Sequence, residues 1–300
     1  MRKDIEFKTE DRVTLRGWHY VPDGRAERFP TIVMAHGFSG VKEMFLDDFA
    51  KCFADAGLAA IVFDNRNFGA SDGQPRQEIN PHQQISDYRD AITFAETLPQ
   101  TDSARIGVWG SSFSGGHVLV VGATDRRVKC VVSQVPSISG YATSRRMTRP
   151  DLAARMNAML DADRRNRYQG KPSAMLPVIS ENPAGPAALP QHETWVWFTE
   201  TSKSRAPAWK NEITLRSAEL VRAYEPGTYI GQISPTPLLM IVALEDHVAF
   251  ADEALAAYER ALEPKKLVML KGGHFDAYGK HLKSAAEAGR DWFVQHLCQS

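Results

Sequence analysis

The strongest constraint on the fold is an alternation between short apolar runs and stretches with apolar residues at helical spacing. TIVMAHG at 31–37 and LAAIVFD at 58–64 are continuous apolar runs, typical of parallel strands that are buried on both faces. The segment between them has apolar residues at helical spacing, namely Phe45, Phe49, Phe53 and Ala56. Gly57 follows and is typical of the C-terminal end of a helix. Repetition of this unit predicts an α/β fold with a mostly parallel sheet and helices on both faces.

The same alternation extends along most of the chain. The first 22 residues alternate in polarity instead, which predicts two half-buried strands joined by a turn at 9–12. Further buried strands are predicted at 105–110, 128–135, 236–244 and 266–270. Helical patterns lie at 85–98 and at 113–122. A third is marked by Leu255, Tyr258 and Leu262, and a C-terminal helix is marked by Trp292, Phe293 and Leu297.

Residues 138–230 break this alternation. They contain a proline- and glycine-rich loop at 172–190. They also contain one amphipathic helix pattern, formed by Leu152, Met156, Met159 and Leu160. A group of aromatic residues follows, namely Trp195, Trp197, Phe198 and Trp209. Because the interruption separates two predicted strands, we expect an inserted helical cap on the active-site face. The core is then formed by 1–137 and 231–300.

Composition excludes several classes of protein. The formal net charge is zero, so the overall charge gives no reason to expect nucleic acid or an anionic membrane as a partner. Three widely spaced cysteines, Cys52, Cys130 and Cys298, form no metal-binding spacing and are expected to be reduced thiols. The N-terminus has no apolar signal region and the apolar runs are too short to span a bilayer, so a cytoplasmic location is expected.

One segment has the pattern of a nucleophile turn. VWGSSFSGGH at 108–117 joins a predicted strand to a predicted helix and places Ser112 at the bend, beside the N–H groups of the helix N-terminus. Such a bend needs small neighbours. Gly110 meets that need, whereas Ser114 stands where the G-x-S-x-G pattern has its second glycine. A glycine-rich turn without chemistry is the alternative that this segment alone leaves open.

Residues with the chemistry to activate Ser112 follow in the required order of serine, acid and histidine. Asp246 comes just after the predicted strand at 236–244, and His274 comes just after the strand at 266–270. Because open α/β folds place their sites at the carboxyl ends of parallel strands, we expect the three side chains to meet. The sequence therefore predicts a catalytic triad of Ser112, Asp246 and His274.

Other residues compete for these roles. Glu245 is expected to point to the opposite face and into solvent. His247 lies on the same loop as the acid, from which it cannot easily join acid and serine. His117 is expected to be packed inside a helix, and His281 to be exposed at the start of the last one.

Acyl transfer also requires donors for the oxyanion. The first predicted donor is the backbone N–H of Phe113, directly after the nucleophile, and the second is the N–H of Phe38 in the loop after the strand at 31–35. His36 in that loop is expected to bond neighbouring backbone groups rather than to act in catalysis.

Together these segments resemble the α/β-hydrolase superfamily: HGF at 36–38, FDNRNFGASDG at 63–73, WGSSFSGG at 109–116, Asp246, and GGHFDAY at 272–278. They look most like its dienelactone-hydrolase-like branch of esterases and peptidases, which includes transferases of polyketide acyl chains. The resemblance covers about 5–136 and 232–297, and implies an α/β-hydrolase fold with flanking helices. Asp64, Arg66 and Gly69 match a loop that shapes the sheet edge, and a structural role is expected for them.

The expected function is that of a serine hydrolase, which cleaves a carboxylic ester of a small-molecule acyl substrate through an acyl-enzyme on Ser112. No metal or organic cofactor is required, and HExxH, GxGxxG after a strand and GxxxxGK[ST] are absent from the sequence. An acyltransferase that uses the same triad is the alternative. A binding protein that retained the fold without the chemistry is a third hypothesis.

The substrate is less constrained. Trp195 and Trp197 are candidate substrate contacts, although the aromatic group could instead form the cap's own small core. The many arginines at 141–171 could favour an anionic substrate or form a solvated helix face, since acidic residues are interspersed with them. The sequence leaves the oligomeric state open, including a homo-oligomer.

Overall fold

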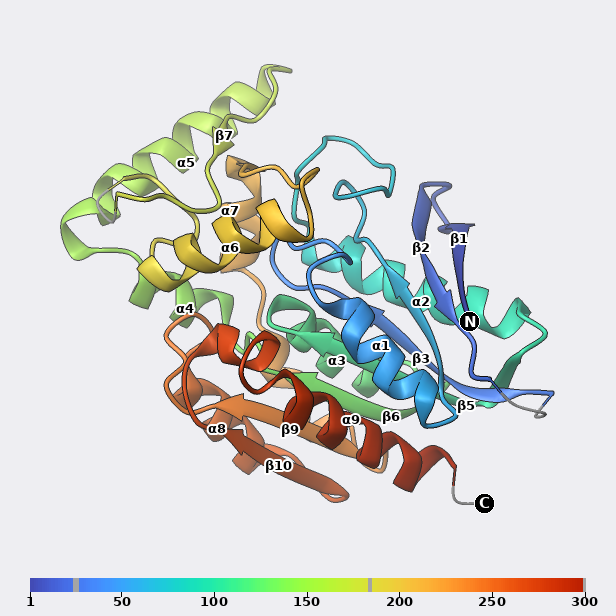
Figure 1. Cartoon of the computed structure of the whole chain (residues 1–300). Helices are drawn as coiled ribbons and strands as arrows, with labels where there is room; N and C mark the ends of the chain where they lie inside the picture. The colour runs from blue at the N-terminus through green and yellow to red at the C-terminus, as the bar shows by residue number, and fades with distance from the viewer. Residues whose placement is uncertain (24–26, 183–184, 299–300) are drawn as a thin grey trace.

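A mostly parallel sheet forms the centre of the computed structural model, which describes residues 1–23, 27–182 and 185–298. Within these residues the sheet has eight strands in the order β1-β2-β4-β3-β5-β6-β9-β10 (Figure 1). β2 is antiparallel to both of its neighbours, and the remaining neighbouring strands run parallel. The strands are β1 (Arg2–Lys8), β2 (Thr14–Tyr20), β3 (Phe29–Ala35), β4 (Ala59–Phe63), β5 (Thr101–Ser111), β6 (Val128–Gln134), β9 (Leu238–Ala243) and β10 (Lys265–Leu270).

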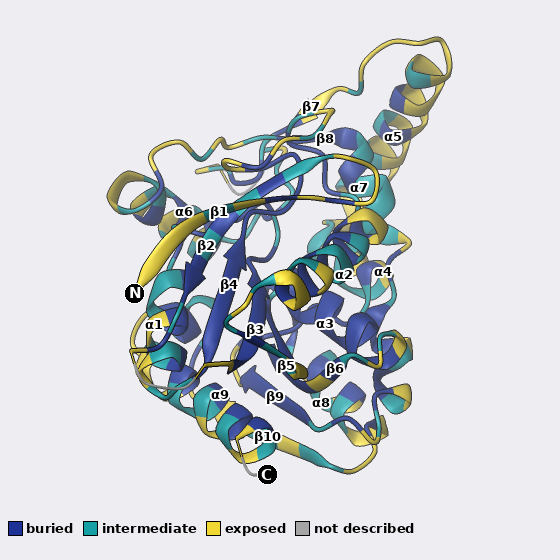
Figure 2. Ribbon diagram, turned by 90° about the vertical axis from the view of Figure 1, so that its right-hand side faces the viewer, coloured by how far each residue is buried: buried dark blue, intermediate teal, exposed yellow. Residues whose placement is uncertain are grey.

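Helices cover both faces of the sheet, as the apolar runs require. Every residue of β3, β4 and β9 is buried, so each of these strands needs a packed layer above and below it (Figure 2). One layer contains α1 (Leu46–Asp55) and α9 (Leu282–Leu297), whose Phe53 and Phe293 rings meet edge to face. The other contains α2 (Pro81–Thr97), α3 (Phe113–Thr124) and α8 (Ala251–Arg260). The predicted fold class is confirmed.

Between β6 and β9 the described part of the chain adds no strand to this sheet. It forms helices above one end of the sheet and a separate two-stranded pair, β7 (Met175–Leu176) with β8 (Ile213–Thr214) (Figure 1). The helices are α4 (Gly140–Met147), η1 (Pro150–Leu152), α5 (Ala153–Tyr168), α6 (His192–Ser204), α7 (Leu215–Arg222) and η2 (Pro226–Gln232). The sequence pattern predicted α5 but missed α4, α6 and α7.

Two further features qualify the sequence analysis. Leu262 was expected on the buried face of a helix, but α8 ends at Arg260 and Leu262 is exposed. A proline disfavours helical backbone at the residue before it, here Glu263, so the helix ends before that residue. The three cysteines are free thiols, and Cys130 is buried in β6.

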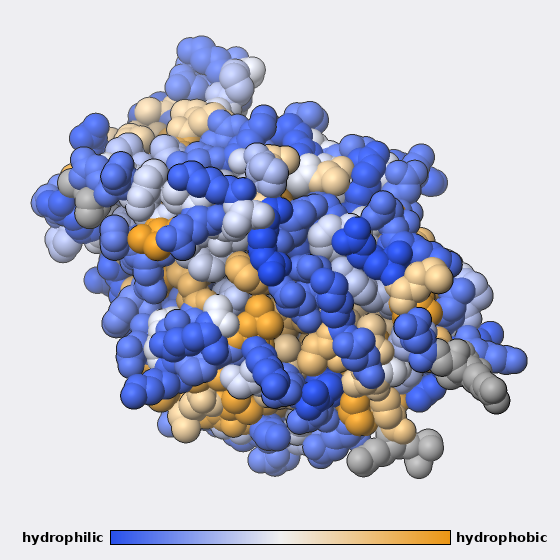
Figure 3. Space-filling view, viewed as in Figure 1, coloured by the Kyte–Doolittle hydropathy of each residue, from blue (hydrophilic) through white to orange (hydrophobic). Residues whose placement is uncertain are grey.

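In the part of the chain that the structure describes, no helix has the length and apolar character to cross a bilayer. On the face shown in Figure 3 hydrophilic side chains predominate, over the helices between β6 and β9 as well as over the sheet.

Candidate active site

Ser112 occupies a strained turn between β5 and α3. Its backbone has φ 59° and ψ −119°, a conformation that side-chain-bearing residues rarely adopt and that is typical of functional positions. The turn is fixed by two backbone bonds, from the Ser112 N–H to the Gln134 carbonyl and from the Ser137 N–H to the Ser112 carbonyl, both 2.9 Å. A Cβ on Gly110 would lie 2.1 Å from the Ser114 carbonyl oxygen, so only glycine fits there.

The departure from the G-x-S-x-G pattern has a structural role of its own. Ser114 is fully buried, and its Oγ donates to the carbonyl oxygen of His36 at 2.5 Å. The same loop approaches the nucleophile, because a Cβ on Gly37 would lie 2.7 Å from the Cβ of Ser112. Ser114 thus joins the turn at Ser112 to the loop after β3, a contact that a second glycine could not make.

The structure brings the three predicted catalytic residues together. Ser112 Oγ lies 3.0 Å from His274 Nε2, and His274 Nδ1 lies 2.6 Å from Asp246 Oδ2. Asp246 follows β9, and His274 begins η3 (His274–Tyr278) after β10. These distances are within hydrogen-bonding range, and the three side chains stand in the order in which a nucleophile, a base and an orienting acid are arranged in serine hydrolases.

Hydrogen bonds hold Asp246 in its ionised form. Its Oδ1 accepts from the N–H groups of Val248 and Ala249, both at 2.8 Å. Burial by itself raises the pKa of Asp246, but the charge and hydrogen bond of His274 and the two backbone bonds outweigh it, so the pKa lies below its usual value. An ionised Asp246 requires His274 Nδ1 to donate to it, which leaves Nε2 to accept the proton of Ser112.

The competing residues lie outside the hydrogen bonds that join Ser112, His274 and Asp246, although His247 borders the same pocket. Glu245 and His247 are exposed, whereas Asp246 between them is 4 % exposed. His117 is buried in α3, with Nδ1 2.8 Å from the Tyr224 hydroxyl and Nε2 3.0 Å from Gln84 Oε1. The expectation that His281 is exposed is wrong: it is half-buried where the chain turns into α9.

The two predicted oxyanion donors border the same space. A Cβ on Gly37 would lie 3.1 Å from the Phe113 nitrogen, so the loop that carries Phe38 packs against the start of α3. The rings of Phe38 and Phe113 meet edge to face, with centroids 5.8 Å apart. Among the described residues neither backbone N–H donates to a protein acceptor, so both are free to bind an oxyanion.

His36 bonds neighbouring backbone, as the sequence analysis expected. Its Nδ1 accepts from the Gly37 N–H at 2.8 Å, and its Nε2 lies 3.1 Å from the Met44 carbonyl oxygen. Burial lowers the pKa of His36 to about 4, which keeps the ring neutral and its Nε2 a donor. The ring therefore fixes the shape of the loop that carries Phe38.

The residues that resemble the sheet-edge loop of the superfamily make structural contacts. The buried Asp64 accepts from Lys42 Nζ at 2.7 Å, and Arg66 pairs with Asp87. Gly69 has φ +51°, and a Cβ there would lie 2.3 Å from Asp64 Oδ2. None of the three is among the described residues that line the cavity at Ser112.

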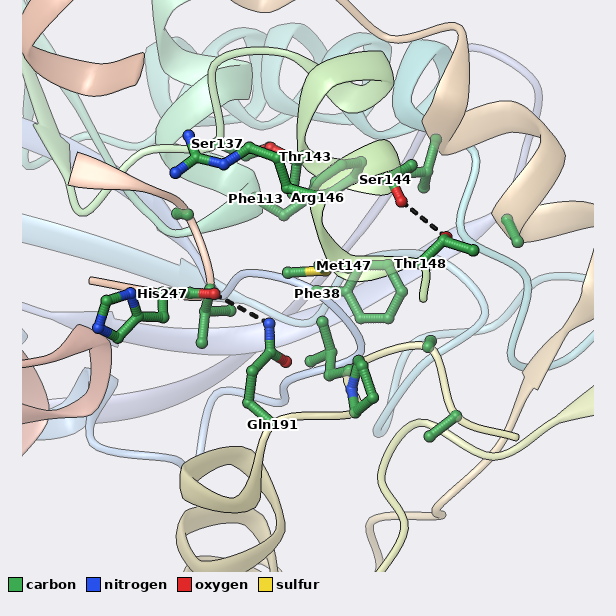
Figure 4. Close-up of a pocket in the computed structure, with 18 of the residues that line it drawn as sticks. Phe38, Phe113, Ser137, Thr143, Ser144, Arg146, Met147, Thr148, Gln191 and His247 are labelled. Atoms are coloured by element: carbon green, nitrogen blue, oxygen red, sulfur yellow. Dashed lines mark hydrogen bonds between the residues drawn. The ribbon is translucent and has the colours of Figure 1, made fainter. Parts of the chain in front are cut away.

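A cavity of about 580 Å³ opens above Ser112 and His274. Figure 4 shows Phe38, Phe113 and Met147 around this space, and Gln191 donating its amide to the His247 carbonyl oxygen at 2.9 Å. The segment between β6 and β9 supplies a mainly apolar wall that includes Met147, Leu152, Met156, Met159, Leu176 and Val221. Sequence reasoning missed Met147 and Gln191, which lie in segments without helical or strand periodicity.

The two tryptophans proposed as substrate contacts differ in position. Trp197 lines the cavity and stacks on Phe275, next to His274, with ring centroids 4.6 Å apart and planes at 20°. Trp195 is not among the described lining residues and packs against the apolar core instead. Two residues along α6 correspond to a rotation of about 200°, so the two side chains lie on nearly opposite faces. The structure therefore gives no support to Trp195 as a substrate contact.

Within 1–23, 27–182 and 185–298, no group of three or more histidine, cysteine, aspartate or glutamate side chains could hold an ion.

Comparison with known proteins identifies the family. A family model described as X-Pro dipeptidyl-peptidase (S15 family) matches residues 11–276. The chain belongs to the S15 family. The S15-family chain is 34% identical to a thiohydrolase from Eupenicillium brefeldianum over 279 residues, covering 92% of this chain and 88% of the relative. It is 30% identical to the polyketide transferase grgF from a Penicillium species over 297 residues, covering 99% and 97%.

A solved structure agrees with this assignment. The crystal structure of the α/β hydrolase GrgF from Penicillium sp. sh18 matches with a TM-score of 0.85 and 28% identity, covering 100% of both chains. The predicted resemblance to the α/β-hydrolase superfamily is therefore confirmed. The S15-family chain is an enzyme of the α/β-hydrolase kind, and the relatives it matches are named thiohydrolase and polyketide transferase.

Proposed function

We propose that this S15-family protein cleaves carboxylic esters and thioesters through an acyl-enzyme on Ser112. The observation that carries the proposal is the chain of hydrogen bonds from Ser112 Oγ through His274 to Asp246, at 3.0 and 2.6 Å. Ser112, at one end of this chain of hydrogen bonds, lines a cavity that is large enough for a small-molecule acyl group.

In the first half-reaction Ser112 Oγ attacks the acyl carbonyl carbon while His274 Nε2 accepts the hydroxyl proton. The carbonyl oxygen becomes an oxyanion that the N–H groups of Phe38 and Phe113 stabilise. The tetrahedral adduct then collapses, the carbon–oxygen or carbon–sulfur bond breaks, and His274 returns the proton to the leaving group. The acyl group remains on Ser112.

In the second half-reaction water takes the position of the departed leaving group. His274 removes a proton from the water, the resulting oxygen attacks the acyl carbon, and the proton passes to Ser112 Oγ as the acid is released. Asp246 holds the imidazole in one orientation and stabilises its positive charge in both half-reactions. Its low pKa, caused by the bonds from His274, Val248 and Ala249, keeps it ionised for this role.

Residues 138–230 act in this proposal as a cap that selects the acyl group. Met147, Met156 and Met159 line the cavity, and their flexible thioether side chains can adapt to acyl chains of different shape. The thiohydrolase and polyketide transferase names of the relatives support a thioester as one substrate class.

The test is labelling with a fluorophosphonate, which reacts with an activated serine regardless of the natural substrate. We expect one phosphonyl group on Ser112 and no labelling of Ser112→Ala. Ser111→Ala is the matched control, because Ser111 Oγ is buried and bonds Tyr278 and Gln134 instead of the triad. Labelling at Ser111 or Ser114, or equal labelling of Ser112→Ala, contradicts the proposal.

An acyltransferase on the same triad is the second candidate, and the polyketide transferase relative favours it. In that reaction an alcohol or amine replaces water in the second half-reaction. The measurement is the ratio of transferred to hydrolysed product from a p-nitrophenyl acyl ester with added alcohol acceptors. A ratio that far exceeds the acceptor-to-water concentration ratio favours transfer, and a ratio equal to it favours hydrolysis.

A further inference from the structure

The charges around the catalytic cavity are unbalanced. Its described lining contains four arginines and no carboxylate, although the whole chain has 36 Lys and Arg and 36 Asp and Glu. The arginines are Arg146, Arg149, Arg155 and Arg222, and all four lie between β6 and β9. A neutral apolar substrate gives no reason for this imbalance.

Two of the four arginines are neutralised by nearby carboxylates. Arg146 Nη1 lies 2.8 Å from Asp252 Oδ1, and its guanidinium stacks on the Phe250 ring at 3.6 Å. Arg149 Nη2 lies 2.7 Å from Asp151 Oδ2. These two side chains have partners that explain their presence.

The other two arginines have no acidic partner among the described residues. Arg222 Nη1 donates to the neutral side-chain oxygen of Asn157 at 2.9 Å, and the exposed Arg155 forms no hydrogen bond or ion pair with another described residue. Arg155 lies on α5 and Arg222 on α7, two helices that pack against each other. Both therefore contribute an uncompensated positive charge to the same wall of the cavity.

Carboxylates on the protein balance two other arginines of α5. Arg164 and Arg167 both bond Glu219, and Arg167 also bonds Asp163 at 2.8 Å. Their charges are thus balanced by carboxylates on the protein. Arg155 and Arg222 face the cavity without such carboxylates.

We propose that Arg155 and Arg222 form a binding site for an anionic group, a carboxylate or phosphate, carried by the acyl substrate. The inference rests on the proposed function, since it specifies which acyl compounds the site at Ser112 prefers. Two guanidinium groups suit such an oxyanion because each offers paired N–H donors. The anion has two sources: a carboxylate at the far end of the acyl chain, or the phosphate of a phosphopantetheine leaving group in a thioester.

Paired substrates distinguish these sources. In the acyl arm, 4-nitrophenyl monosuberate is compared with its neutral methyl ester. In the leaving-group arm, octanoyl-S-4′-phosphopantetheine is compared with octanoyl-S-pantetheine. We expect the charged member of one pair to have a kcat/KM about 10-fold higher in the wild-type protein, a preference that declines as salt is added.

The double variant Arg155→Gln/Arg222→Gln is expected to reduce that preference to near unity. Two controls are matched to it. Arg165→Gln removes another exposed, unpaired arginine of α5 that is not among the described lining residues, and Asn157→Ala removes the contact of Arg222 while both cations remain. Both controls are expected to retain the preference.

The inference is supported if the wild-type protein prefers the charged substrate in one arm and the double variant loses that preference. The arm in which this happens identifies the source of the anion. Absence of a preference in both arms, or the same preference in the double variant, overturns it. Fluorophosphonate labelling of Ser112 in each preparation separates the two proposals. Loss of labelling in the wild-type protein defeats the proposed function, whereas normal labelling without a charge preference defeats only the anion site.

Discussion

The proposed catalytic residues and the cavity wall above them are held in place in different ways. Ser112, Asp246 and His274 follow the strands β5, β9 and β10 and are fixed by hydrogen bonds of 2.6 to 3.0 Å. The wall facing them contains partly buried methionines and leucines, which apolar packing holds in place. Hydrogen bonds fix atoms in one geometry, whereas unbranched apolar side chains can repack. The contrast implies that reactivity and acyl selection are separable by mutation.

The largest expected effect is at the nucleophile. Ser112→Ala removes the atom that forms the acyl-enzyme, so ester hydrolysis is expected to fall by on the order of 10⁴-fold or more. Because the chemistry is shared by all substrates, the loss should be equal for acetyl and octanoyl esters. Initial rates with both 4-nitrophenyl esters check this. A loss confined to the octanoyl ester would break the separation between core and cap.

The next largest loss of activity is expected at Asp246, the acid of the proposed triad. Asp246→Asn can present an N–H to His274 and fix the wrong tautomer, so kcat is expected to fall by about 10³–10⁴-fold, less than in His274→Ala. Glu245→Gln is the matched control, since Glu245 is an exposed neighbour without a bond to His274. Near-normal turnover of Asp246→Asn together with an inactive Glu245→Gln would transfer the role of the acid to Glu245.

A smaller and selective effect is expected in the cavity wall. Trp197→Ala removes a ring that lines the cavity, so kcat/KM for octanoyl or aromatic acyl esters should fall by about 10–100-fold, and that for the acetyl ester much less. The ratio of the two kcat/KM values is the measurement. Trp195→Ala, on the opposite face of α6, should leave the ratio unchanged.

Because Trp197 also stacks on Phe275 beside His274, a second outcome is informative. An equal loss on short and long acyl esters with a lowered melting temperature would show that Trp197 supports the catalytic histidine rather than the acyl group. The cap and the core would then be coupled at this ring.

The smallest catalytic effect is expected at His117, a core residue away from the triad. Burial lowers its pKa to about 3. Between pH 6.5 and 3 the unfolded chain therefore binds a proton at this site that the folded chain excludes, so stability falls as the pH decreases. The loss is about 2 kcal/mol at pH 5 relative to pH 7.

His117→Gln should abolish this part of the pH dependence while leaving the ratio of acetyl to octanoyl activity unchanged. Urea unfolding at pH 7 and pH 5 provides the measurement, because other buried histidines contribute equally to both proteins. An identical loss of stability in wild type and variant would place the proton uptake at another group.

The sequence predicted the structure best in segments where the apolar residues follow a single spacing. The runs that form β3 and β9 are apolar throughout and buried on both faces, and the carboxyl ends of β5, β9 and β10 place Ser112, Asp246 and His274 at one edge. The order of residues along the chain was therefore enough to predict which side chains meet. It was not enough to predict the bond from Ser114 to His36, which depends on β3 being the neighbour of β5. The expectation of a buried strand at 266–270 is wrong, because β10 lies at the edge of the sheet and has only Leu270 buried.

The helices between β6 and β9 were harder to predict for identifiable reasons. α4 begins at Gly140, where a Cβ would lie 1.8 Å from the Val221 carbonyl oxygen, so close packing requires a residue that weakens the helical pattern. α6 carries Trp195 and Trp197 on nearly opposite faces, and both rings pack against core residues. A helix that is apolar on more than one side has no single stripe to detect.

The most direct test of the account is to identify the acylated residue itself. The protein is mixed briefly with 4-nitrophenyl octanoate, quenched in acid, digested and analysed by mass spectrometry. The account predicts one octanoyl group on the peptide that contains Ser112, fragment ions that place it on that serine, and no adduct in Ser112→Ala. An octanoyl group on another residue, or the same adduct in Ser112→Ala, would contradict it.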